Sequence, residues 1–238
     1  SRGIGRAIAT TLAAEGCAVA ICARGADDLE ATATELRATG ATVHAVPVDI
    51  TDTDALTGFV TSTVDALDGL DLVVHNAAAM GIHGQEQWRA SFETDLMAFV
   101  RLAEAAAEPL TRSGGAIVVI ATTSASDVSP PSGARSYGAL KAALIHHAAA
   151  LGQVLGPQGV RVNVVSPGPI EFADGSWARR RSEDPDYYEG IRGRVALGRL
   201  GTVDEVARAV AFLGSPAASF CVGSNLVVDG GLLTRVAF

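Results

Sequence analysis

Six short runs rich in valine and isoleucine recur along the chain, and longer amphipathic stretches separate them. Each run is apolar almost throughout, as in parallel strands that are buried on both faces of a sheet. The runs occupy residues 17–22, 42–46, 70–75, 116–121, 160–165 and 225–229. We expect each of them to form a parallel β-strand.

The stretches between the runs carry apolar residues at helical spacing. Helices are predicted over 27–39, which ends at Gly40, over 52–67, over 86–112 with a stop near Pro109, and from 135 onward. Strands that alternate with helices imply right-handed crossovers with helices on both faces of the sheet. The sequence therefore predicts an α/β fold with one doubly wound parallel sheet, in a single domain over residues 1–238.

The only long stretch without a regular pattern lies at roughly 166–200. In a compact domain an irregular segment of this length usually serves function, for example as a lid over a substrate. We therefore expect a substrate lid at about 168–200. Ligands of open α/β sheets collect at the carboxyl ends of the strands, so the residues that follow each strand are the candidates for binding.

Composition narrows the possible partners. The formal net charge of −8 disfavours nucleic acid as a partner, because its phosphates require a basic surface. The longest apolar runs are too short to span a bilayer. The three cysteines are few, odd in number and far apart, which suggests neither a disulfide framework nor a metal site. No signal-peptide pattern is present, so we expect a cytoplasmic location.

Lysine usage is unusual, because the chain contains 17 arginines and one lysine, Lys141. Arginine replaces lysine on most surfaces, but it does not readily lose its proton and it presents a planar fork instead of a compact charge. The single lysine is therefore a candidate for a position where chemistry requires an ammonium group, with chance as the alternative.

The chain opens on a glycine turn, Gly3 to Gly5, that leads into a helical pattern. Such a turn lets the backbone approach a pyrophosphate, whose charge then meets the N-terminus of the helix. A tight turn into a helix also uses glycine for steric reasons alone, so this feature by itself is weak evidence of nucleotide binding.

Several motifs together resemble the short-chain dehydrogenase/reductase family. Residues 1–5 resemble the tail of its glycine-rich turn, 76–79 its Asn-Ala-Gly motif, and the segment from Tyr137 to Lys141 matches its YxxxK motif. Residues 165–170 and 225–231 resemble two later signatures, so the resemblance covers nearly the whole chain. It implies a Rossmann-like fold and hydride transfer between NADP(H) and a ketone or secondary alcohol, in a homotetramer or homodimer. Family members begin with a strand in the middle of the sheet, and we expect that this sequence starts after that strand.

The resemblance also assigns residues to the cofactor. Arg24 follows the predicted strand at 17–22, where an arginine suits the 2′-phosphate of NADP(H), so we expect preference for NADP(H) with NAD(H) possible. The alternative for Arg24 is an exposed side chain that makes no contact with a cofactor. Asp49 would contact adenine, or instead cap the next helix. The full expected set is Ser1, Arg2, Gly3, Ile4, Gly5, Arg24, Asp49, Ile50, Asn76, Ala77, Tyr137, Lys141, Pro167, Gly168 and Ile170.

The chemistry centres on Tyr137 and Lys141, which share one helical face. A tyrosine has an unperturbed pKa of about 10, so it needs a nearby cation to act near neutral pH. By resemblance Tyr137 is the general acid in reduction, and Lys141 lowers its pKa and binds the nicotinamide ribose. A hydroxyl partner comes from Ser124 by family spacing, or from Thr122 by counting from the strand at 116–121; we expect Ser124.

Asp95 departs from the family, which places an asparagine there. Its charge would pair with Lys141 and weaken the effect of that lysine on Tyr137, unless Asp95 lies out of register.

The substrate pocket gives only weak signals. His83 and the lid aromatics Phe172, Trp177, Tyr187 and Tyr188 are candidates to line it, with packing inside the lid as the alternative for the aromatics. No metal site is expected at His146 and His147, because no second ligand cluster appears.

We therefore expect a reductase for a carbonyl or alcohol substrate, such as a 3-oxoacyl thioester or a specialised-metabolite ketone. The alternative is a noncatalytic NADP-binding regulatory protein.

Overall fold

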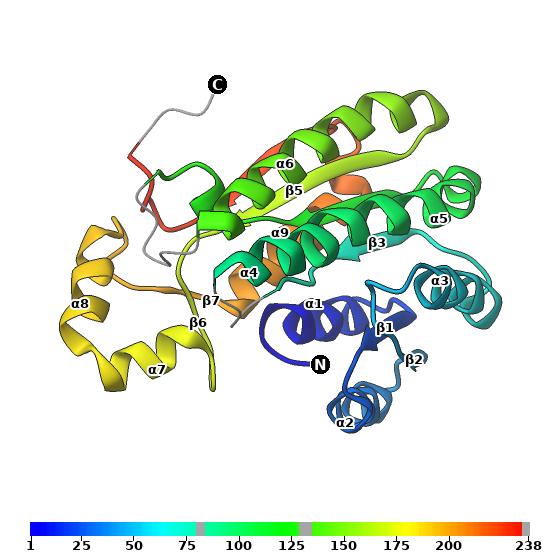
Figure 1. The fold of residues 1–238 in the computed structure, drawn as a ribbon. Coiled ribbons are helices and arrows are strands. Elements are labelled where there is room, and N and C mark those ends of the chain that lie inside the picture. The colour runs from blue at the N-terminus through cyan, green and yellow to red at the C-terminus, as the bar shows by residue number, and fades with distance from the viewer. Residues whose placement is uncertain (80–83, 129–134, 235–238) are drawn as a thin grey trace.

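All six predicted strands form, close to their expected positions. The computed structural model describes residues 1–79, 84–128 and 135–234, shown in Figure 1. The strands are β1 (Val19–Ala23), β2 (Val43–Pro47), β3 (Leu72–His75), β4 (Ala116–Ile120), β5 (Arg161–Pro167) and β8 (Asn225–Val228). Uninterrupted burial in β4 and near-complete burial in β5 match their continuous apolar sequences.

Every strand pair is parallel, which confirms the predicted α/β class. Strands β3, β4, β5 and β8 lie side by side in that order, and within the described residues β1 and β2 pair only with each other. A third pair, β6 (Ile170–Glu171) with β7 (Gly201–Thr202), was not predicted, because two-residue strands carry no periodic signal.

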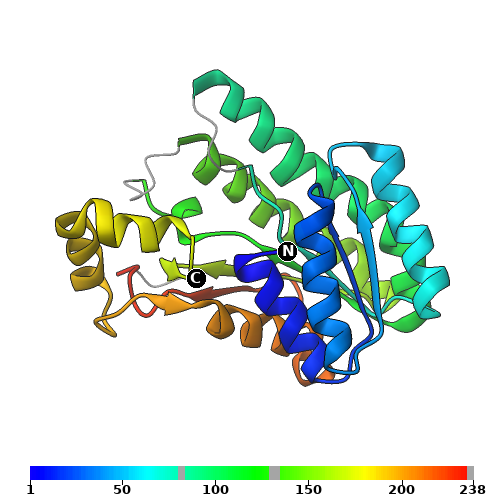
Figure 2. The same ribbon diagram turned by 90° about the horizontal axis from the view of Figure 1, so that it is seen from below.

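Helices cover both faces of the sheet (Figures 1 and 2). The main helices are α1 (Gly3–Ala14), α2 (Ala26–Ala38), α3 (Thr53–Leu67), α4 (Gly84–Ser91), α5 (Ala98–Ser113), α6 (Arg135–Leu155) and α9 (Val203–Gly214). Alternate side chains of β4 point to opposite faces of the sheet. Ile117 and Val119 therefore pack against α3, α5 and α6, and Val118 and Ile120 pack against α1 and α9. Short 3₁₀ turns are η2 (Thr123–Ala125), η3 (Gly156–Gln158) and η4 (Pro216–Ala218).

The helix predicted over 86–112 differs in two ways. A π-helical segment, η1 (Phe92–Met97), separates α4 from α5. The predicted stop near Pro109 is wrong, because α5 continues through Pro109 to Ser113. Proline lacks one backbone N–H, so Pro109 removes a single hydrogen bond from α5, and the helix instead ends at Gly114, whose φ of 65° is left-handed.

The segment expected to be irregular contains two helices, α7 (Ser176–Glu183) and α8 (Pro185–Arg194), which project at one end of the molecule (Figure 1). They are joined by side-chain stacking. The rings of Trp177 and Tyr187 lie parallel at 6.2 Å, and the Arg180 guanidinium lies 4.6 Å from the centre of the Tyr187 ring. The Tyr188 hydroxyl donates to Glu171 at 2.6 Å. Trp177, Tyr187 and Tyr188 thus make contacts within the segment 166–200, whose role as a lid stays a prediction.

None of the helices in the described ranges is long and apolar enough to cross a membrane.

Candidate active site

Tyr137 and Lys141 lie one turn apart on α6, and Lys141 is buried against the end of β4. Only 1% of the Lys141 side chain is exposed. Its ammonium donates to the Ile120 carbonyl at 2.9 Å and lies 5.9 Å from the centre of the Tyr137 ring. A buried ammonium is costly unless it is paired, so the single lysine of the chain occupies a site built to hold its charge.

The Thr122 hydroxyl, on the second residue after β4, lies beside the Tyr137 phenol and acts to lower its pKa. The backbone N–H of Ser124 donates to the Thr122 hydroxyl at 3.2 Å. The Ser124 carbonyl lies so close to α6 that a Cβ at Gly138 would approach it to 2.7 Å. The Ser124 backbone thus packs against α6 and the Thr122 hydroxyl lies beside the phenol, whereas the choice between Ser124 and Thr122 as the catalytic hydroxyl stays a prediction.

Asp95 lies on η1 and pairs with Lys141, so it is not out of register. Its carboxylate Oδ1 lies 3.1 Å from the Lys141 ammonium, and the side chain is fully buried. The backbone N–H of Ala79 points toward the other oxygen at 3.5 Å. The π-helical turn presents the Asp95 carbonyl to His75, whose Nε2–H donates to it at 3.1 Å. π-Helical turns often occur at functional sites.

Burial and charge perturb the titration of this cluster. Burial and the negative charge of Asp95 raise the pKa of Tyr137 to about 12, against the opposing effect of the Thr122 hydrogen bond. Burial lowers the pKa of Lys141, while Asp95 acts in the opposite direction. Burial and the charge of Lys141 lower the pKa of His75 to about 3, so this imidazole is neutral at pH 7.

The glycine turn opens α1 and is packed tightly. Gly3 has a φ of 55°, which favours glycine, and a Cβ there would lie 2.9 Å from the Phe172 ring. A Cβ on Gly5 would lie 2.6 Å from the Asn76 side-chain amide. Two predicted motifs, far apart in the sequence, thus meet at the start of α1, and Phe172 packs on the turn.

Arg24 and Asp49 lie beyond the carboxyl ends of β1 and β2, as expected. Both are exposed. The backbone N–H and hydroxyl of Thr51, followed by the Arg24 charge, lower the pKa of Asp49. Asp52, not Asp49, caps α3 by accepting from two backbone N–H groups. The capping role considered for Asp49 is therefore wrong, and its carboxylate stays beside Arg24.

The two later motifs lie next to each other. Pro167 pairs with Val228 across β5 and β8, and a Cβ on Gly168 would lie 2.7 Å from Asp229. Ile170 then enters β6 with 6% of its surface exposed. Glycine at 168 thus permits the approach of the chain after β5 to the chain after β8.

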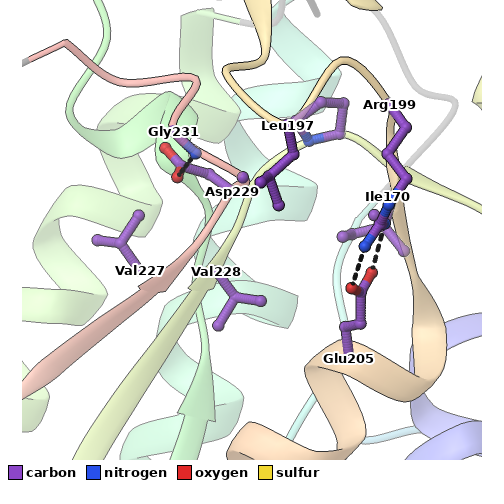
Figure 3. A pocket seen from close by; sticks show the side chains of 11 residues that line it. Ile170, Leu197, Arg199, Glu205, Val227, Val228, Asp229 and Gly231 are labelled. Carbon is purple, nitrogen blue, oxygen red and sulfur yellow. Dashed lines mark hydrogen bonds and ion pairs between the residues drawn. The ribbon is translucent and has the colours of Figure 1, made fainter.

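A pocket of about 310 Å³ lies beside these motifs, between Ile170, Leu197 and Val228 (Figure 3). Its polar side chains are already paired. Arg199 holds Glu205 with two bonds of 2.7 and 3.0 Å, and Asp229 accepts from the backbone of Gly231. Tyr137 and Lys141 do not line it, so we do not assign the reacting groups to this pocket.

Two of the histidines considered in the sequence analysis, His146 and His147, lie on α6. His83 lies outside the described residues, His146 is exposed, and the ring of His147 packs edge-on against Phe99. Sequence reasoning missed His75, although it directly precedes Asn76 at the end of a strand, which is where binding residues were sought.

Comparison with known proteins shows which family the chain resembles in sequence. Residues 1–233 match the family described as enoyl-(acyl carrier protein) reductase. The chain is 36% identical to isoepoxydon dehydrogenase of Penicillium expansum, covering 100% of this chain and 93% of the relative. It is 33% identical to the 3-oxoacyl-[acyl-carrier-protein] reductase of Escherichia coli, with coverage of 98% and 93%.

A solved structure extends the comparison to three dimensions. The NADPH-bound short-chain oxidoreductase of Pseudomonas aeruginosa, described as containing an atypical catalytic center, is 29% identical. It superposes with a TM-score of 0.89 over 99% of this chain and 94% of its own. The chain belongs to the short-chain dehydrogenase/reductase family and is an NAD(P)-dependent oxidoreductase.

Proposed function

We propose that this protein reduces a ketone to a secondary alcohol with NADPH, using Tyr137 as general acid. The observation that carries the proposal is the position of the Tyr137 ring, whose centre lies 5.9 Å from the buried Lys141 ammonium at the end of β4, with the Thr122 hydroxyl beside the phenol. Hydride transfer to a carbonyl leaves negative charge on oxygen, so the site needs a proton donor and a second hydrogen-bond donor there.

The residues present fit a dinucleotide. The glycine turn leaves no room for a Cβ at Gly3 or Gly5, and the side chain of the N-cap residue Arg2 makes no capping hydrogen bond to α1. Its backbone N–H groups are thus available to a pyrophosphate. Asn76 and Ala77 follow β3 beside Gly5, and Pro167, Gly168 and Ile170 follow β5. When bound, the cofactor supplies the hydride.

The side chains of the chain itself divide the remaining work. Tyr137 donates its phenolic proton to the carbonyl oxygen as that oxygen gains charge, and the Thr122 hydroxyl donates a hydrogen bond to the same atom. The Lys141 ammonium donates to the Ile120 carbonyl and forms an ion pair with Asp95, and it has further N–H groups that would donate to a ribose hydroxyl.

Removing the Thr122 hydroxyl tests which side chain completes the site. We expect Thr122→Val to lower kcat/KM by about 10²- to 10³-fold, as for loss of one donor to an oxyanion, whereas Ser124→Ala changes it by only a few fold. Steady-state kinetics of both variants are the measurement. The reverse ranking would return the role to Ser124, as the family spacing predicts.

Arg24 carries the proposed preference for NADPH. We expect Arg24→Ala to raise the Kd of NADPH by roughly 10- to 100-fold through loss of charge-assisted hydrogen bonds to the 2′-phosphate, and to leave NADH nearly unchanged. Fluorescence titration with both cofactors measures this. Arg37→Ala, which removes an exposed arginine paired with Glu30, is the matched control. An equal loss for both cofactors would remove the preference from Arg24.

The proposed substrate class is based on the names of similar proteins. We propose a 3-oxoacyl thioester or a specialised-metabolite ketone, because relatives are named for both kinds of chemistry. Assembly as a homotetramer or homodimer in the cytoplasm stays a prediction.

The test of function is NADPH oxidation across a panel of cyclic and open-chain ketones and 3-oxoacyl thioesters. Turnover that is faster with NADPH than with NADH supports the proposal. NADPH binding without turnover of any ketone or thioester in the panel would favour the alternative function, that of a noncatalytic NADP-binding regulatory protein.

A further inference from the structure

Asp95 places a full negative charge inside the reacting cluster. Its carboxylate lies 3.1 Å from the Lys141 ammonium, and the two side chains are 0% and 1% exposed. Burial of an ion pair costs solvation free energy that the pairing offsets only in part, and the Ile120 carbonyl already accepts from the same ammonium. The charge therefore calls for an explanation within the site.

Four elements bring the charged and polar groups of this cluster together around Asp95. Lys141 and Tyr137 belong to α6, His75 ends β3, Asp95 belongs to η1, and the Ile120 carbonyl ends β4. His75 is neutral at pH 7 because its pKa is about 3. With a protonated phenol the cluster thus carries one positive and one negative charge, and its net charge is zero.

Loss of a proton would leave this cluster with a net negative charge away from water. Burial and a nearby negative charge both oppose the ionised phenol. Without the Asp95 charge the same loss would take the cluster from net positive to neutral, which is easier. This holds whichever of Tyr137 and Lys141 releases the proton, because the two titrate as a coupled pair.

We propose that Asp95 is a positioning residue whose buried carboxylate keeps the Tyr137 phenol protonated at neutral pH, and that it thereby sets the site for carbonyl reduction over alcohol oxidation. A protonated phenol is ready to give a proton, as reduction requires, whereas oxidation of an alcohol requires the phenolate as base. The bias toward reduction rests on the proposed function; the protonation state of Tyr137 does not.

A spectroscopic titration tests the protonation state without substrate or cofactor. Tyrosinate absorbance is followed against pH for the wild type and Asp95→Asn, and the curve of the matching Tyr137→Phe protein is subtracted from each. We expect Asp95→Asn to lower the pH at which the Tyr137 tyrosinate forms by about 1 to 3 pH units. Identical difference curves for the two proteins would overturn the proposal.

Two further variants serve as controls for the tyrosinate titration. Glu93→Gln removes another carboxylate of η1, one that is 44% exposed and paired with Arg101 at 3.1 Å, and it should leave the titration unchanged. Asp95→Ser removes the charge with a smaller side chain and should reproduce the shift if Asp95→Asn folds poorly, as judged by circular dichroism.

Kinetics test the direction of reaction. In Asp95→Asn we expect alcohol oxidation near neutral pH to rise about tenfold or more relative to ketone reduction, because each pH unit changes the phenolate fraction tenfold. A uniform loss at every pH, with an unmoved profile, would mean that Asp95 is only structural and would overturn the proposal. A shifted titration in a protein that turns over no substrate would instead contradict the proposed function and leave the effect of Asp95 on Tyr137 standing.

Discussion

Tyr137→Phe is expected to lower kcat/KM for ketone reduction by about 10²- to 10⁴-fold, the usual contribution of a positioned general acid. The substitution keeps the ring and removes only the hydroxyl that Thr122 meets. Since the proposed cofactor contacts lie mainly on the glycine turn and after β3 and β5, the Kd of NADPH should change little. Steady-state kinetics together with a fluorescence titration of NADPH give both values.

Tyr187→Phe provides the matched control for that loss. Tyr187 on α8 stacks on Trp177 of α7, and phenylalanine keeps a ring for the same stacking. We expect its kcat to stay within a few fold of the wild type. Comparable losses in the two variants, or full activity in Tyr137→Phe, would contradict the assignment of Tyr137.

Lys141→Met should destabilise the protein by about 3–5 kcal/mol, because it leaves the Asp95 carboxylate buried without its partner. Methionine fills a similar length of the cavity, so the loss reports charge more than packing. Chemical denaturation of wild type and variant measures the change in the free energy of unfolding.

A double-mutant cycle separates the pair from its surroundings. Asp95→Asn combined with Lys141→Met should recover much of the stability lost in Lys141→Met alone, because neither charge then remains buried. Arg112→Met breaks an exposed ion pair with Glu108 on α5 and should cost less than about 1 kcal/mol. Strictly additive effects of the two substitutions at 95 and 141 would show that these side chains do not interact.

The sheet was predictable because its strands are buried on both faces and read as continuous apolar runs. The same rule gave no signal for β6 and β7, which are two residues long, and it predicted an irregular segment at 166–200. The charged pattern of α7 and α8 hides their helical character: no residue of α7 is buried, and in α8 only Tyr188 and Ile191 are. Helices that bury so little surface lack the apolar stripe that sequence reasoning detects.

The site was predictable where spacing alone fixes geometry. Tyr137 and Lys141 share a face because residues four apart on a helix do so. The hydroxyl partner of Tyr137 could not be chosen in this way. Thr122 and Ser124 lie in the connection between β4 and α6, and the sequence alone does not give the path of that connection. The pairing of Asp95 with Lys141 joins η1 to α6, and only the packing of those helices decides whether the two side chains meet.

The most direct test of the central claim follows a deuteride from cofactor to product. The protein is incubated with NADPH carrying deuterium on the transferable position of nicotinamide C4, in both stereochemical forms, and with the ketone and 3-oxoacyl thioester panel, and the products are analysed by mass spectrometry. We predict an alcohol with one deuterium on the former carbonyl carbon from one form of the cofactor, and about 10²- to 10⁴-fold slower formation of it with Tyr137→Phe. NADPH that binds but transfers deuterium to no carbonyl of the panel would contradict the account.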